Sequence, residues 1–163
     1  MLIKIKKDGT LIYKNFRFRC VLGRSGIKKN KKEGDKATPK GIFSLGKLYY
    51  RSDRMKKIKT NLKCKVIKKN MGWCNNPNDE KYNREFKLNL KKKGEKLFRK
   101  DHKYDFFISI NYNIDPAVPN KGSAIFLHLT QNYKPTAGCI AINIKNFLTL
   151  VKYIKSNDKI KIG

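Results

Sequence analysis

Apolar and basic residues alternate at both ends of the chain, and this two-residue period is typical of half-buried β-strands. Ile3 and Ile5 alternate with lysines near the amino terminus, and the last five residues, KIKIG, repeat the pattern. Asp8 and Gly9 form a tight-turn dipeptide, so residues 11–18 are predicted to pair back on the first strand as a hairpin. Both ends of the chain therefore contribute strands to the predicted fold.

Three apolar runs in the middle of the chain predict buried strands, because near-continuous hydrophobic stretches of this length are typical of sheet cores. They are IFSLGKLYY at 42–50, DFFISI at 105–110 and AIFLHL at 124–129. The connection 21–41, rich in glycine and lysine, is long for a compact domain, and such loops are usually functional. Residues 51–105 predict loops, short strands and one short helix near 91–99.

One helix is predicted near the carboxyl terminus, over about 144–155. Asn143 is a suitable N-cap because its side chain can accept a hydrogen bond from the first turn. The apolar positions at helical spacing are Phe147, Leu148, Val151 and Ile154. Strands otherwise dominate, and a chain of 163 residues is the usual size of one domain. We therefore expect a mainly-β single domain over 1–163 with one amphipathic helix.

The formal net charge of +28 raises the alternative of a non-enzymatic nucleic-acid-binding domain. However, the chain has 33 lysines and only 7 arginines, and arginine is the better bidentate reader of phosphates and bases. Isoleucine and asparagine are also abundant, as in proteins encoded by AT-rich genomes. We therefore interpret most of the charge as a solvated surface that attracts acidic partners generally, including polymers that carry carboxylates.

The four cysteines form no CxxC pair, and the chain has only two histidines, so neither a metal site nor a cofactor is expected. The chain also lacks an apolar signal-peptide segment and a run long enough to cross a membrane. From these features alone we expect a cytoplasmic chain, a mature chain or one exported by another route. We also expect a monomer without a transmembrane segment.

Cys139 and His128 are the strongest candidates for chemistry. Cys139 follows a glycine at a predicted turn and precedes an apolar strand, and His128 ends the preceding apolar run. A free thiol is only slightly ionised at neutral pH, but a neighbouring imidazole can accept its proton and hold the thiolate as an ion pair. A hairpin-like return over 130–136 would bring the two onto adjacent strands, with a backbone carbonyl orienting the imidazole. Either residue alone would more often have a packing role.

Four ordered blocks resemble the L,D-transpeptidase catalytic-domain (YkuD-like) family over about residues 18–163. They are LGRSGI with EGDKATPKGIF, then GWCNNPNDEKYNREF, then YDFFISINYN, and finally GSAIFLH with PTAGCIAI. The common family signature has a second histidine directly before Gly-Cys, where this chain has Ala137, and its His-to-Cys spacing is longer. His128 must therefore serve as the only base.

The resemblance implies a β-sandwich or barrel-like domain in which Cys139 is the nucleophile and His128 the base. It implies an oxyanion hole from the backbone N–H groups of Ala137, Gly138 and Cys139. The implied substrates are peptidoglycan stem peptides, from which the thiolate releases D-Ala before a second stem forms a 3–3 cross-link. Water as the resolving nucleophile would instead give a carboxypeptidase or an amidase. The family implies a periplasmic or cell-envelope location.

Further residues in the matching blocks are candidates for substrate binding. Arginines are candidates because a guanidinium can bind a carboxylate with two hydrogen bonds. Polar and aromatic residues of the middle block could line a cleft, although packing roles are equally compatible with the sequence. The candidates are Arg24, Trp73, Tyr82, Asn83, Arg84 and Thr136.

Overall fold

The computed structural model describes residues 1–163, and its first three strands follow the alternating pattern. β1 (Leu2–Ile5) pairs with β2 (Thr10–Tyr13) in antiparallel register. The predicted second strand is in fact two strands, because the chain turns again at Lys14 and Asn15 before β3 (Phe16–Val21). Lys14 has a φ of 52°, which is the left-handed geometry of a tight turn.

The predicted core strands and the carboxyl-terminal helix are confirmed, but residues 91–99 contain no helix. That segment holds the two-residue strand β10, so its apparent helical pattern was misleading. The remaining elements are β4 (Ile27–Lys28), β5 (Thr38–Pro39), β6 (Gly41–Tyr50), β7 (Cys64–Val66), β8 (Met71–Trp73), β9 (Glu85–Lys87), β10 (Glu95–Lys96), β11 (Phe106–Ile110), β12 (Phe126–Leu129), β13 (Ile140–Ile142), α1 (Ile144–Tyr153) and β14 (Lys159–Ile162).

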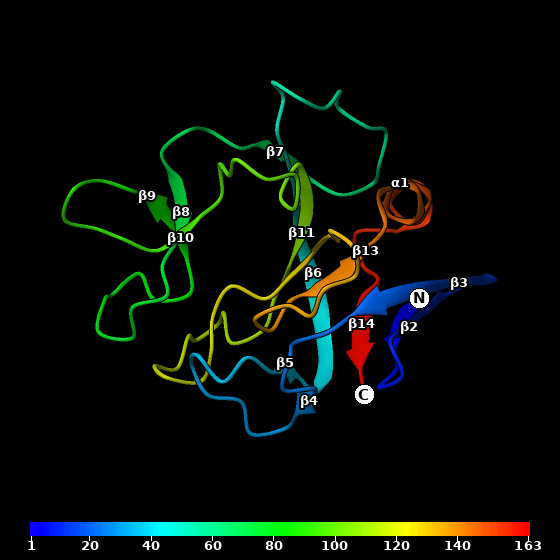
Figure 1. Cartoon of the computed structure of the whole chain (residues 1–163), viewed down its shortest axis with the longest axis horizontal. Helices are drawn as coiled ribbons and strands as arrows, with labels where there is room; N and C mark the ends of the chain where they lie inside the picture. The colour runs from blue at the N-terminus through cyan, green and yellow to red at the C-terminus, as the bar shows by residue number, and fades with distance from the viewer.

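The main sheet closes into a barrel. Eight of its nine strands follow the order β11-β12-β13-β3-β2-β1-β14-β6, and an antiparallel pairing of β6 with β11 closes this ring. The ninth strand, β7, pairs in parallel with β6. The terminal strands β1 and β14 are parallel neighbours, which places both chain ends at one side of the barrel (Figure 1). A smaller sheet of β10, β8 and β9 lies apart, on the side of β6 and β11 (Figure 1).

Alternating side chains give the barrel strands two different cores. Leu127, Ile140 and Ile160 belong to the larger cluster, which all eight barrel strands and α1 share. Phe107 and Phe126 point the other way and pack with Trp73 of β8 in a second cluster. Because successive side chains of a strand face opposite sides, one strand serves both cores. The second cluster attaches the small sheet to the barrel wall.

Helix α1 begins as the sequence predicts, since the Asn143 side chain accepts a hydrogen bond from the Lys145 backbone N–H at 2.8 Å. It buries Phe147, Leu150 and Val151 against the larger core. Leu150 was not among the predicted face residues, and Leu148 is only partly buried. No helix of the structure combines the length and apolar character that a membrane span requires.

Candidate active site

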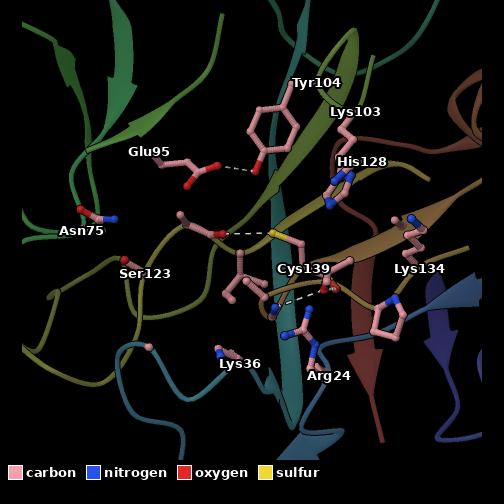
Figure 2. A pocket seen from close by; sticks show the side chains of 18 of the residues that line it. Arg24, Lys36, Asn75, Glu95, Lys103, Tyr104, Ser123, His128, Lys134 and Cys139 are labelled. Atoms are coloured by element: carbon pink, nitrogen blue, oxygen red, sulfur yellow. Dashed lines mark hydrogen bonds between the residues drawn. The ribbon is translucent and has the colours of Figure 1, made fainter. Parts of the chain in front are cut away.

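Strands β12 and β13 place His128 and Cys139 on the same side of the sheet. The strands are parallel, with His128 opposite Ala141 and Leu127 opposite Ile140. The predicted hairpin-like return is therefore wrong in direction, because the loop over 130–138 runs back along the sheet before β13 starts. The predicted adjacency holds: Cys139 directly precedes β13, and His128 and Cys139 face the same cleft (Figure 2).

The turn that carries Cys139 is tied to the loop after β3. The Thr136 carbonyl accepts a hydrogen bond from the Arg24 backbone N–H at 2.9 Å, and the Thr136 backbone N–H donates to the Leu22 carbonyl at 3.0 Å. Its hydroxyl donates to the Cys139 carbonyl and accepts from the Gly138 N–H at 3.1 Å. The loop is held in turn by Thr38, whose hydroxyl accepts from Gly23 at 2.8 Å. Thr136 therefore shapes the cysteine turn through both its backbone and its side chain.

Gly138 is required by both its backbone conformation and its surroundings. Its φ is +143°, in a region that other residues rarely adopt. A Cβ at this position would lie 2.9 Å from the Ala37 carbonyl oxygen, which belongs to the backbone and cannot rotate away. The backbone N–H groups of Ala137 and Cys139 make no hydrogen bond within the chain. The glycine thus allows a turn that presents free N–H donors beside the sulfur.

We predict that Gly138→Ala lowers the free energy of unfolding by about 1–3 kcal/mol, because of backbone strain. It should also slow acylation of Cys139 by on the order of 10²-fold, since the nucleophile and the N–H donors move together. Thermal unfolding and intact-mass kinetics measure the two effects. Gly26→Ala is the control, because Gly26 has a φ of +73° but open space around its Cβ position. Equal acylation rates in both variants would contradict the role of the turn.

The Cys139 thiol is almost completely buried and held in place by two backbone groups. Its Sγ donates to the Ala124 carbonyl at 3.2 Å and accepts from the Phe126 N–H at 3.4 Å. Burial raises the pKa of the Cys139 thiol to about 12, since a thiolate in an apolar environment is poorly solvated. Ala124 has a φ of 52°, an uncommon value for alanine, so the carbonyl that meets the thiol belongs to a strained residue.

His128 is fixed in the tautomer that a base requires. Its Nδ1 lies 2.8 Å from the Leu129 carbonyl oxygen, which can only accept, so Nδ1 carries the proton and Nε2 has a free lone pair. Its ring packs edge-on against Tyr104, at a centroid distance of 5.3 Å. Burial lowers the pKa of the His128 imidazole to about 4, because the protein interior disfavours the imidazolium. The predicted orienting backbone carbonyl is therefore present.

These two pKa values correct the expectation of a resting ion pair. A thiol pKa near 12 and an imidazole pKa near 4 leave both groups neutral at every pH between those values. The thiol proton must then move to the imidazole as the sulfur attacks, rather than beforehand. The free N–H groups of the turn would stabilise the charge that develops at that moment.

We predict that alkylation of Cys139 by iodoacetamide is slow at neutral pH and keeps rising beyond pH 9. Iodoacetamide develops no oxyanion at the turn that couples attack to proton transfer, so it reacts with the free thiolate alone, whose fraction grows about tenfold per pH unit below a pKa near 12. Peptide mapping after timed alkylation separates Cys139 from the other three free thiols, Cys20, Cys64 and Cys74. A plateau below pH 8 would instead indicate a preformed thiolate and contradict the neutral pair.

The two residues line a cleft of about 580 Å³ between the barrel wall, the loop after β3 and the small sheet (Figure 2). Six basic and two acidic side chains line this cleft: Arg24, Lys31, Lys36, Arg99, Lys103 and Lys134, with Glu33 and Glu95. Two of the basic side chains form ion pairs: Lys31 with Asp35 at 2.7 Å, and Arg99 with Asp101 at 2.6 Å. Arg24 and Thr136, both predicted from sequence, lie in the cleft together with Ala137 and Gly138.

Trp73, Tyr82, Asn83 and Arg84 do not line the cleft. The Trp73 indole donates to the Asn83 side-chain oxygen at 2.9 Å, and the same oxygen accepts from the Ala124 N–H at 3.0 Å. Tyr82 is buried, and its hydroxyl donates to Glu33. Arg84 is half-exposed near Asp115, at 3.7 Å. Asn83 and Trp73 thus support Ala124, whose carbonyl accepts a hydrogen bond from the Cys139 thiol.

Sequence reasoning did not select Tyr104 and Glu95. The Tyr104 hydroxyl donates to Glu95 at 3.0 Å, beside the Cys139 sulfur (Figure 2). Tyr104 directly precedes the buried run of β11, which was the one available signal. Glu95 lies in a charged segment without a pattern. No group of three or more histidine, cysteine, aspartate or glutamate side chains is arranged to hold a metal ion.

Comparison with known proteins gives one family and one fold. The family model "L,D-transpeptidase catalytic domain" (YkuD) matches residues 2–162. The crystal structure of the helical cell shape determining protein Pgp2 from Campylobacter jejuni is similar with a TM-score of 0.50 and 17% identity, over 99% of this chain and 46% of that one. The crystal structure of a point mutant of Pgp2 is similar with a TM-score of 0.48 and 18% identity, over the same shares of the two chains. The search of curated proteins found no match.

The chain thus spans less than half the length of the solved Pgp2 structures, and at this identity the likeness concerns the fold. The barrel with its single helix agrees with that fold. The family match is independent of the structural likeness and covers nearly every residue. On this match, the chain belongs to the L,D-transpeptidase catalytic domain (YkuD) family.

Proposed function

We propose that the chain is a cysteine-dependent L,D-transpeptidase that acts on peptidoglycan stem peptides in the cell envelope. The observation that carries the proposal is that Cys139 and His128 line one cleft, within a chain of this family. In the first step, Sγ attacks the carbonyl of the third stem residue while His128 Nε2 takes the thiol proton. The C–N bond then breaks, and the same proton passes to the departing amine of D-Ala.

The developing oxyanion would be held by the backbone N–H groups of Ala137, Gly138 and Cys139. Those of Ala137 and Cys139 are free, whereas that of Gly138 bonds the Thr136 hydroxyl and would have to exchange this partner. Each such donor typically contributes about 3 kcal/mol to the stability of the transition state. The turn therefore leaves free two of the three donors that the family resemblance implies for the hole.

Basic side chains on one side of the cleft suit the carboxylates of the stem peptide. Arg24, Lys36 and Lys134 line it and have no ion-pair partner. Arg24 is best suited, because a guanidinium binds a carboxylate with two parallel hydrogen bonds. We assign Arg24 to direct substrate contact, with Asn83 and Trp73 positioning Ala124 beneath the sulfur.

The test is to incubate the purified chain with a disaccharide tetrapeptide and to follow products by mass. Release of D-Ala with a cross-linked dimer supports transpeptidation. Release of D-Ala with tripeptide alone favours the carboxypeptidase alternative, because water then resolves the same thioester. Absence of both products from a folded chain would contradict the proposal.

A further inference from the structure

Glu95 is one of two acids that line a mostly basic cleft, and it is the one whose partner Tyr104 lies beside the Cys139 sulfur (Figure 2). Most lining charges are positive, and Glu33, the other acid, accepts a hydrogen bond from Tyr82. Glu95 uses only Oε1, which accepts from the Tyr104 hydroxyl at 3.0 Å and from Arg99 at 3.5 Å. Its Oε2 has no hydrogen-bond partner. The charge of Glu95 is also close enough to Cys139 to help raise the pKa of that thiol, after the larger effect of burial.

Two neutral polar residues, Ser123 and Asn75, line the same side of the cleft as Glu95 (Figure 2). Ser123 is 8% exposed, and its hydroxyl lines the cleft without any hydrogen-bond partner. Asn75 lies on the same side of the cleft, whereas Arg24 and Lys36 lie on the other side of Cys139 (Figure 2). An unpartnered buried hydroxyl is costly unless a ligand satisfies it. The cleft therefore has a cationic side and an acidic side, with the sulfur between them.

Arg99 does not cancel this acidic character. Its guanidinium makes two hydrogen bonds with Asp101, at 2.9 Å and 2.6 Å, and only a long contact with Glu95. Its charge is therefore already compensated. Lys103 lies beside His128, away from Asn75 and Ser123 (Figure 2). A primary ammonium group that enters on this side of the cleft would meet the free Glu95 oxygen, and the other labelled polar residues there, Asn75 and Ser123, are neutral (Figure 2).

We propose that Glu95, on the side of the cleft that Ser123 and Asn75 also line, binds the primary amine of the acceptor stem that resolves the thioester. This assignment rests on the function proposed above and specifies where its second substrate enters. The ammonium binds Glu95 and loses one proton to solvent. Its lone pair attacks the thioester carbon, the C–S bond breaks, and the second amine proton passes through His128 Nε2 to the departing sulfur. The site favours transfer over hydrolysis by concentrating amine beside the thioester.

The test compares Glu95→Gln with Glu80→Gln, which removes the same charge from an exposed side chain outside the cleft. With tetrapeptide as donor and acceptor, Glu95→Gln should lower the ratio of dimer to tripeptide about tenfold, the effect of ~1.4 kcal/mol in amine binding. Acylation of Cys139 by a carbapenem should not slow, because the lost negative charge opposed thiolate formation. The two opposite effects exclude general damage, and thermal unfolding checks the fold.

An unchanged product ratio in Glu95→Gln, with the wild-type chain making dimer, would overturn the assignment and leave the proposed function intact. A wild-type chain that makes tripeptide but no dimer would also overturn it, since no amine is then used. A wild-type chain that releases no D-Ala would contradict the proposed function itself.

Discussion

Cys139→Ala is expected to abolish D-Ala release and dimer formation, leaving no product above the uncatalysed background. The variant cannot form a thioester, and loss of a covalent nucleophile typically costs a factor of about 10⁶ in turnover. The structure gives no substitute, because the other three thiols, those of Cys20, Cys64 and Cys74, do not line the cleft. Product masses from the tetrapeptide assay give the measurement.

A matched control variant tests whether the loss of activity is specific to the Cys139 sulfur. Cys64→Ala removes a partly buried thiol on β7 and should retain full activity. Carbapenem, which the family resemblance implies as an acylating agent, should add its mass to the wild-type chain and to Cys64→Ala but not to Cys139→Ala. A carbapenem adduct or D-Ala release in a folded Cys139→Ala chain would exclude the cysteine mechanism.

The positions of the barrel strands could be predicted because each strand has a local hydrophobic pattern in the sequence. The alternation of β1 and β14 and the apolar runs of β6, β11 and β12 all correspond to strands of the barrel. The helix predicted at 91–99 failed because the segment is charged and short, and its Leu97 is buried by contacts with distant residues of the second core. Pattern alone could not separate a surface helix from a strand held by tertiary packing.

Cys139 and His128 could be selected as candidates for a similar reason, since both residues lie within one short segment of the sequence. The acidic side of the cleft could not. Glu95 and Tyr104 meet Cys139 only after the small sheet has docked on the barrel through the second core. The sequence also could not predict that Cys139 and His128 are both neutral, because this follows from the burial of the two side chains rather than from their residue types.

His128→Gln is expected to lower the rate of Cys139 acylation by about 10²–10⁴-fold, the usual contribution of a positioned general base. Glutamine can keep a hydrogen bond to the Leu129 carbonyl through its amide group, but it cannot take a proton. Because the thiol has a pKa near 12, attack without a base must await the rare thiolate. The rate should then rise about tenfold per pH unit, whereas the wild-type rate should vary little above pH 5, where the imidazole is already neutral.

Acylation by a carbapenem, followed by intact mass from pH 5 to pH 9, measures both the loss and the change of slope. His102→Gln is the control, since His102 has a side chain 82% exposed and bonds Asp105 at 2.6 Å, away from the cleft. A loss of rate with an unchanged flat profile would mean that His128 only packs against Tyr104. A steep profile in the variant, with wild-type behaviour in His102→Gln, requires that the His128 imidazole accept the proton, since burial alone would leave the slope unaltered.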